Sequence, residues 1–409
     1  MAYPLTITAS AMRAINRSAI LEIIRRESPI SRTAIAERLD VSLPTVMRIV
    51  DGLLEEGFVR LQGSTEWSGG RRRPLLEFNA DSYVVLGVDM GGTKMYGAIS
   101  DLRGKILDEV NIGRHGTHGE ESFNSLTTLI DTLLASPKVE GRRVRGIGVG
   151  APGITHHKEG IVKWAFTLDW KDFPLKARLA ERYPLPITVD NDVNLAVLGE
   201  HWFGAGQSAQ NMVLVAIGTG IGAGIIIDGA LYRGSTEASG EIGNMLPGRE
   251  FLGGNFRDFG ALESVASGTG IAERARRLLK HETTIEGDGH TAGVANTAGL
   301  DDLLAEDVFD AARHGQKWAW AIIDETVDYL AVAVANLAVS FDPDLIVLGG
   351  GVSRSADMLI EPILRRIKDA IPTPPRLVVS NLGLRATVMG AITNVLHNTS
   401  NFYVVHKLS

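Results

Sequence analysis

Three runs of apolar residues each end in a cluster of glycines, and this pattern constrains the fold more than any other feature. The first run leads into the turn DMGGTK at residues 89–94, the second into IGTGIGAG at 217–224, and the third into GGG at 349–351. A glycine turn after a buried strand lets backbone N–H groups approach anionic oxygens closely. The first two turns also lead into further strands, which predicts an internally duplicated α/β body.

The same turns supply the candidate nucleotide-binding residues. Thr93 offers a hydroxyl and Lys94 a positive charge to phosphate oxygens, while Asp89 could hold a metal ion or its water. The predicted set is Asp89, Gly91, Gly92, Thr93, Lys94, Gly218, Thr219, Gly220, Gly349 and Gly350. Each glycine run alone is a weak signal, but the three together are a strong one.

Composition narrows the class of protein. A chain of 409 residues is too long for one ordinary hydrophobic core, and 44% apolar with 22% charged residues is typical of folded globular domains. There is no cysteine, which excludes disulfides, thiolate nucleophiles and cysteine-bound metals. No apolar run is long enough to cross a bilayer, and the first residues do not resemble a signal peptide, so we expect a cytoplasmic protein that does not insert into membranes.

The first 79 residues have the pattern of a winged helix-turn-helix. Residues 11–27 and 31–39 predict two helices, the second capped by Ser31, and a turn at Asp40 leads to a third helix that Ser42 can cap. Two strands, at 58–61 and 74–78, would form a hairpin around a loop at 63–73. On the third helix one face is apolar, and the residues of that face are Val46, Ile49, Val50, Leu53 and Leu54.

The opposite face of that helix carries small, polar or basic side chains that fit a major groove. The loop tip adds three adjacent guanidiniums suited to phosphate or minor-groove contact. The candidate DNA-binding residues are therefore Ser42, Thr45, Met47, Arg48, Arg71, Arg72 and Arg73. This head has eleven arginines against nine carboxylates, whereas the rest of the chain carries the net negative charge. The alternative is a helical dimerisation module with a solvated basic loop.

The segments DMGGTK, GVGAPG, DNDVNLAVLGE, IGTGIGAGI, GEIGN, LES and PDLIVLGGGVS resemble the ROK family of repressors, open reading frames and kinases. The head followed by this body resembles the family's regulators over nearly the whole chain. The resemblance implies an actin-like, two-lobed sugar-kinase fold that binds sugar between its lobes and forms homodimers or homotetramers. The expected division is a DNA-binding domain at 1–79, a first lobe at 80–195 completed by a C-terminal helix at 385–409, and a second lobe at 196–384.

The resemblance also assigns roles within the cleft. In the family's kinases the aspartate of the N-D-x-N motif, here Asp192, takes the proton from a sugar hydroxyl, a task that suits a nearby carboxylate. The alternative for Asp192 is an Asx turn or helix cap. Glu241 and Glu263 match the two glutamates that bind sugar hydroxyls in the family, and the alternative for them is a surface or capping role. The expected ligand-binding residues are Thr167, Asn191, Asp192, Glu241, Asn244 and Glu263.

Two departures from the family concern metal and sugar. The family's zinc is held by a histidine and three cysteines, whose positions here are Asn244, Gly254, Phe256 and Ala261, so we expect no zinc. We hypothesise that apolar packing in this loop positions Glu263 instead, through Phe251, Leu252, Phe256 and Phe259. Thr167 stands where the family has an asparagine. The nearby Trp164, Phe166 and Trp170 could stack on a sugar or belong to the core.

These patterns predict a sequence-specific transcriptional regulator that represses carbohydrate uptake or catabolism. A sugar, polyol or derivative in the cleft would control its affinity for operator DNA. The alternative is an ATP-dependent sugar kinase with Asp192 as base and with ATP and Mg²⁺ as cofactors. The DNA-binding head and the altered sugar contacts favour sensing over turnover, since a displacement of about 1 Å in the acceptor can cost on the order of a hundredfold in rate.

Overall fold

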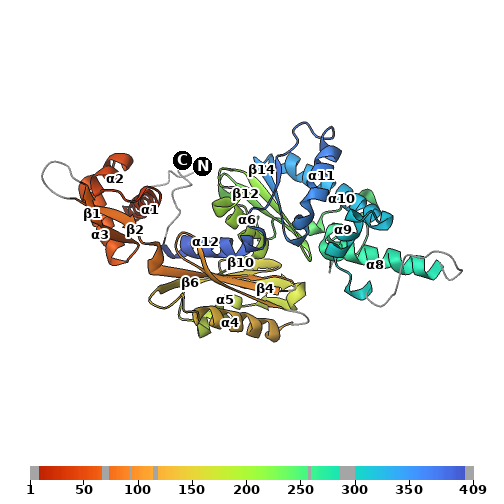
Figure 1. Ribbon diagram of the computed structural model, residues 1–409, viewed down its shortest axis with the longest axis horizontal. Helices are drawn as coiled ribbons and strands as arrows, with labels where there is room; N and C mark the ends of the chain where they lie inside the picture. Colours follow the sequence, from red (N-terminus) through yellow and green to blue (C-terminus); the bar gives the residue numbers. More distant parts are fainter. Residues whose placement is uncertain are drawn as a thin grey trace.

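The chain folds into a small N-terminal domain and two larger lobes that follow one another along the longest axis of the molecule (Figure 1). In this computed structural model the described residues are 9–66, 73–92, 94–113, 118–256, 259–285 and 300–400. Arg71, Arg72 and Thr93 lie outside the described residues, as does the side chain of Arg73.

The N-terminal domain is a winged helix-turn-helix. Helices α1 (Ala9–Glu27), α2 (Arg32–Leu39) and α3 (Leu43–Glu55) precede an antiparallel hairpin of β1 (Val59–Glu66) and β2 (Arg73–Phe78). The expected apolar face of α3 is buried at Val46, Ile49, Val50 and Leu53. The hairpin extends farther than the sequence indicated, because residues 63–66 continue β1 instead of starting the loop.

The first lobe, here lobe 1, is built on a five-stranded sheet in the order β10-β6-β3-β4-β5. Helices α4 (Glu120–Leu134) and α5 (Leu175–Arg182) cover one face, and α12 (Ala386–Ser400) covers the other. A meander of β7 (Ile154–His156), β8 (Ile161–Ala165) and β9 (Trp170–Phe173) lies beside the sheet. The sheet strands are β3 (Tyr83–Met90), β4 (Lys94–Ser100), β5 (Ile106–Gly113), β6 (Arg143–Ala151) and β10 (Ile187–Asn191).

The second lobe, lobe 2, repeats this topology. Its sheet order, β13-β12-β11-β14-β15, corresponds strand by strand to β5-β4-β3-β6-β10 of lobe 1. In each sheet a three-stranded antiparallel meander is followed by two strands that run parallel to the first strand of the meander. The predicted duplication is therefore confirmed. The strands are β11 (Met212–Ile217), β12 (Ile221–Ile227), β13 (Ala230–Leu231), β14 (Leu345–Gly349) and β15 (Leu377–Val379).

Helices bury both faces of the lobe 2 sheet. On one face, residues of α7 (Glu263–Ala266), α8 (Gly268–Ile285), α9 (Ala305–Arg313), α10 (Lys317–Phe341) and α11 (Ile360–Ile367) form one apolar cluster with the strands. On the other face lies α6 (Asp192–Phe203), which also packs on α12 of lobe 1. Residues 281–285 form the last turn of α8.

Glycines let α12 lie directly on its neighbours. A Cβ at Gly148 in β6 would lie 2.4 Å from the carbonyl oxygen of Ala391, and one at Gly390 would lie 1.7 Å from that of Leu195 in α6. Both distances are too short for any side chain atom, so the backbones touch. The expected division at 195/196 falls inside α6, and these boundaries remain predictions.

A continuous apolar cluster joins the head to lobe 1. It runs from Ile20 and Leu53 of the head to Val388 and Leu396 of α12. At the joint, the rings of Phe58 and Tyr83 stack with centroids 5.1 Å apart. The guanidinium of Arg145 lies 5.4 Å from the Phe58 centroid and 5.6 Å from the Tyr83 centroid, and it donates hydrogen bonds to Thr399 at the end of α12. The head is thus packed on the lobe and not tethered by a bare linker.

Candidate functional site

Four carboxylates from the two lobes converge between the sheets. Asp89 ends β3, Asp192 begins α6, Glu241 precedes a 3-10 turn after β13, and Glu263 begins α7. All four are partly buried. Burial raises the pKa of both Asp192 and Glu241. Repulsion adds to these increases, from Asp89 and Glu241 at Asp192 and from Glu263 at Glu241, so neighbouring members of this set interact.

Burial perturbs the protonation of this cluster. It raises the pKa of Asp192 to about 8, with further increases from Asp89 and Glu241 and an opposing hydrogen bond that its carboxylate accepts from the backbone N–H of Val193. Burial likewise raises the pKa of Asp89 to about 7, which Lys94 partly offsets. A carboxylate that titrates near neutrality can accept or donate a proton when it meets a hydroxyl, as sites that bind polyols or activate hydroxyl groups require.

The glycine turns meet at the same place. A Cβ on Gly92, in the β3–β4 turn of lobe 1, would lie 2.8 Å from the Oγ1 of Thr219 in lobe 2. Gly350 packs on Ile217, two residues before Thr219. A Cβ on Gly350 would lie 2.4 Å from the carbonyl oxygen of Ile217. The structure therefore brings together all three turns that the sequence singled out, although Thr93 itself is outside the described residues. Whether they hold a nucleotide remains a prediction.

Lobe 2 orients its glutamates through the backbone. Glu263 accepts a hydrogen bond from the N–H of Ile221 at 2.8 Å, and its carboxylate lies where side chains on Gly220 or Gly243 would clash. Its pKa is raised, chiefly by burial. Asn244 is exposed at the end of the 3-10 turn after Glu241. These contacts bring the segments that carry Glu241, Asn244 and Glu263 together in lobe 2.

At the end of β10, Asn191 has a structural role beside its predicted one. Its Oδ1 accepts the N–H of Asn194 and so caps α6, and its Nδ2 donates to the carbonyl of Gly153 at 2.9 Å. The capping role considered for Asp192 thus belongs to its neighbour. Thr167 lies in a half-buried 3-10 turn after β8, and its contact with a sugar remains a prediction.

Among the nearby aromatic residues, Trp170 belongs to the core. It is 3% exposed, stacks on Phe173 with centroids 4.1 Å apart, and donates its indole N–H to the carbonyl of Gly119. It therefore cannot stack on a ligand. Trp164 and Phe166 are 47% and 61% exposed, so they alone of the three are available to another molecule.

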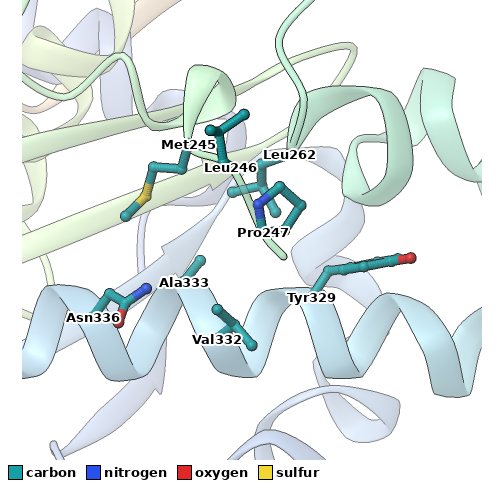
Figure 2. A pocket seen from close by; sticks show the side chains of 8 residues that line it. All are labelled: Met245, Leu246, Pro247, Leu262, Tyr329, Val332, Ala333 and Asn336. Atoms are coloured by element: carbon teal, nitrogen blue, oxygen red, sulfur yellow. The ribbon is translucent and has the colours of Figure 1, made fainter. Parts of the chain in front are cut away.

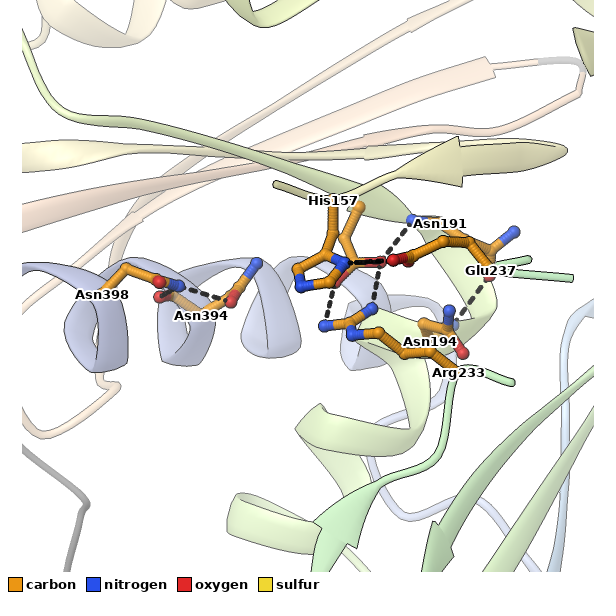
Figure 3. Close-up of polar contacts among 8 residues, drawn as sticks. His157, Asn191, Asn194, Arg233, Glu237, Asn394 and Asn398 are labelled. Carbon is orange, nitrogen blue, oxygen red and sulfur yellow. Dashed lines mark hydrogen bonds and ion pairs between the residues drawn. The ribbon is translucent and has the colours of Figure 1, made fainter. Parts of the chain in front are cut away.

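Sequence reasoning missed a group of charged residues that joins the lobes beside Asn191 (Figure 3). Arg233 of lobe 2 forms a two-pronged ion pair with Asp190 at the end of β10, with both distances 2.7 Å. Beside it, Nδ1 of His157 in lobe 1 lies 2.8 Å from the carboxylate of Glu237 in lobe 2. No local pattern reveals pairs between residues this far apart in the sequence.

The head displays the expected DNA-binding face. Ser42, Met47 and Arg48 are exposed along α3, and Thr45 is half-buried. Ser42 occupies the capping position, but its hydroxyl contacts the Thr45 hydroxyl at 2.9 Å and makes no capping bond to the backbone. Among the described ion pairs none involves Arg48, which leaves its charge available to a phosphate or a base. Their contact with DNA remains a prediction.

Family comparisons agree with both parts of the molecule. Residues 85–397 match the model of the ROK family, and residues 13–60 match that of winged helix-turn-helix DNA-binding domains. The chain belongs to the ROK family. Its head gives it the architecture of a regulator within that family, because the DNA-binding match precedes the ROK match in one continuous chain.

Relatives of this ROK protein include both regulators and kinases. A xylose repressor of Caldicellulosiruptor bescii is 28% identical over 96% of this chain and 98% of its own length. A glucokinase of Halalkalibacterium halodurans is 39% identical over 68% of this chain and 83% of its own. The crystal structure of a ROK family transcriptional regulator, a homologue of the E. coli MLC protein, has a TM-score of 0.79 and 24% identity over 97% of this chain and 99% of its own, which supports the fold.

The residues at the family's zinc positions do not fit that metal. Asn244, Gly254, Phe256 and Ala261 present no imidazole or thiolate. Among the described residues, no cluster of three or more histidine, aspartate or glutamate side chains could hold a metal ion. In this loop Phe251 lies 5.8 Å from Phe256 and 5.9 Å from Tyr329 of α10 between ring centroids.

A small apolar hollow lies where this loop meets α10 (Figure 2). Its lining includes Leu262, the residue before Glu263, and none of the expected ligand residues. Leu252, expected to pack in the loop, is 65% exposed. The aromatic contacts of Phe251, not Leu252, therefore connect the loop to α10 behind Glu263.

Within the described part of the chain, no helix has the length and apolar character needed to span a bilayer.

Proposed function

We propose that this protein is a sugar-responsive transcriptional repressor whose winged head binds an operator and whose cleft binds a neutral sugar. The observation that carries the proposal is the single apolar cluster that runs from the head to α12 of the body. Since α6 begins at Asp192 and packs on α12, a molecule that contacts Asp192 acts on the same helix pair that supports the head.

The xylose repressors among the relatives support an aldose as the effector, and the carboxylate cluster supports a ligand rich in hydroxyl groups. The predicted ligand residues include three carboxyl groups and no basic side chain that could pair with a phosphate, so free sugars fit better than sugar phosphates. Glu241, Glu263 and Asp192 would accept hydrogen bonds from the sugar, with Thr167, Asn191 and Asn244 as further contacts. Binding would shift the relative position of the lobes, and a coupling of about 1–3 kcal/mol would change operator affinity.

The regulator would act as a homodimer or homotetramer in the cytoplasm. A symmetric pair of heads presents two α3 helices to half-sites one helical turn apart, or a multiple of it, so the operator is a near-palindrome. Ser42, Thr45, Met47 and Arg48 would contact base edges, while Arg71, Arg72 and Arg73 of the wing contact the backbone or the minor groove. No zinc takes part in this scheme.

The test is fluorescence anisotropy with labelled fragments from the regions upstream of sugar-transport genes. We expect nanomolar, strongly salt-dependent binding to a near-palindromic fragment and a loss of affinity with D-xylose or D-glucose. A protein that binds no genomic fragment at low salt, with or without either sugar, contradicts the proposal.

A second candidate is a sugar kinase, favoured by the glucokinase relative and by the meeting of the three glycine turns. Phosphoryl transfer needs positioning and charge stabilisation, and ATP with Mg²⁺ would supply the phosphoryl group and the metal. Asp192, with its raised pKa, would take the proton from the acceptor hydroxyl. Sugar-dependent ATP consumption that Asp192→Asn abolishes would establish this activity.

A further inference from the structure

An ion pair and a hydrogen bond between a histidine and a carboxylate cross from one loop of lobe 2 to lobe 1 (Figure 3). The loop follows β13 and ends at Glu241, and it carries both Arg233 and Glu237. Arg233 pairs with Asp190, and Glu237 pairs with His157. We call these four residues the clasp.

The buried negative charge of Asp190 depends on its ion pair with Arg233. The residue is fully buried at 0% exposure, and one oxygen accepts the N–H of Asn191 and one nitrogen of Arg233, while the other faces the second nitrogen of Arg233. A buried carboxylate is stable as an anion only when it is paired and hydrogen-bonded. Because its cation comes from the other lobe, the lobes cannot separate at this edge without uncovering Asp190.

The clasp is joined to the ligand residues by short, rigid segments. Asp190 and Asp192 lie two residues apart, at the junction of β10 and α6. In the loop, the N–H of Ser239 donates to the carbonyl of Arg233, and the carbonyl of Gly240 accepts the N–H of Ala223 in β12 at 2.7 Å. A Cβ at Gly240 would lie 1.8 Å from the carbonyl oxygen of Ala223, so the loop lies directly against the sheet just before Glu241.

The second pair lies in a less buried setting. The side chain of His157 is 28% exposed and that of Glu237 is 17% exposed. Glu237 adopts a left-handed backbone conformation with φ of 63°, which an L-residue keeps only where its surroundings determine it. Two contacts at different points of one loop fix its orientation as well as its distance from lobe 1.

We infer that the clasp sets the separation of the two lobes, so that Asp192, at the junction of β10 and α6, and Glu241, at the end of the loop after β13, contact the same sugar. Arg233, Asp190, His157 and Glu237 are positioning residues, since none of them is required to touch the ligand. This inference rests on the proposed function for the identity of the ligand, but the separation of the lobes can be measured without any ligand.

The experiment measures lobe separation and sugar affinity on the full-length protein. The chain has no cysteine, so Glu121→Cys in α4 and Lys317→Cys at the start of α10 accept spin labels at two exposed sites without background. Asp190→Asn/Arg233→Gln removes the clasp's main ion pair without leaving a buried charge. His157→Gln/Glu237→Gln, in a more exposed place, is a second variant that keeps the test decisive if the first does not fold.

Removing either pair should broaden the spin-label distance distribution and raise the Kd for D-xylose or D-glucose at least tenfold. Operator affinity without sugar should change less than twofold. Arg274→Gln is the matched control, because Arg274 is a 10% exposed arginine whose ion pair with Glu325 stays within lobe 2. It should alter thermal stability but neither the distances nor the sugar Kd.

Unchanged distances in folded clasp variants would overturn the inference, as would a sugar Kd equal to that of the parent protein. If the parent protein binds neither sugar, the proposed effector class is wrong, and the distance measurement alone decides: broadening supports the clasp and an unchanged distribution rejects it.

Discussion

Protonation of the carboxylate cluster should make the stability of the body fall as pH rises through neutrality. The pKa of Asp192 is raised to about 8, whereas an aspartate in an unfolded chain titrates near 3.8. Between these values the folded state holds a proton that the unfolded state has released. Stability contributed by this proton is complete below pH 4 and is lost as pH rises through 8.

The magnitude follows from the pKa difference. One pKa unit corresponds to about 1.4 kcal/mol, so the two units between pH 6 and pH 8 give about 3 kcal/mol at most. Asp192 is only partly buried, and solvent screening reduces the expected loss to about 1 kcal/mol. For a body of this size that is a decrease of about 2–4 °C in melting temperature.

Asp192→Asn should remove this part of the pH dependence, because the amide does not titrate. Differential scanning calorimetry at pH 6 and pH 8 measures the effect. Asp302→Asn, at an exposed carboxylate on lobe 2, is the control and should behave as the parent protein. Equal losses of stability in Asp192→Asn and the parent would refute the view that a buried proton is held at this site.

Three further outcomes are expected. Arg48→Ala should weaken operator binding about tenfold and lower its salt dependence, measured by fluorescence anisotropy, because it removes an exposed charge of α3; unchanged affinity would exclude α3 as the reading helix. Phe256→Ala should raise the D-xylose Kd about tenfold by loosening the loop before Glu263, whereas Leu252→Ala, at a 65% exposed position, should not. Gly390→Ala should lower the free energy of unfolding by about 3 kcal/mol in urea denaturation, since its Cβ would lie 1.7 Å from a main-chain carbonyl oxygen of α6. Gly351→Ala, with open space around its Cβ, should lower it by less than about 0.5 kcal/mol.

The features that local patterns encode were predictable from the sequence. The apolar spacing of Val46, Ile49, Val50 and Leu53 identifies the buried face of α3, because helical period determines which side chains share a face. The glycine turns identify the strand ends, and the repeated strand order of the two lobes confirms the duplication that they indicated. The carboxylates of the cleft required the family resemblance, since single aspartates and glutamates carry no such period.

The remaining differences arise from tertiary contacts. Trp170 is buried because Phe173 and the carbonyl of Gly119 complete its environment, and neither contact is visible in the alternation of β9. The wing strand β1 continues to Glu66 through pairing with β2, despite the glycine at position 63 that indicated a loop. The pairing of Arg233 with Asp190 depends on how the two lobes meet, which no window of sequence contains.

The position of α12 on the lobe 1 sheet affects the order in which the lobes fold during synthesis on the ribosome. Lobe 1 begins at β3, but one face of its sheet stays uncovered until residues 386–400 have emerged and folded onto it. All the strands of lobe 2 are translated in the interval. Lobe 2 can therefore complete most of its core first, and a nascent chain carries an exposed apolar surface on lobe 1 until α12 has been translated and has folded onto the sheet.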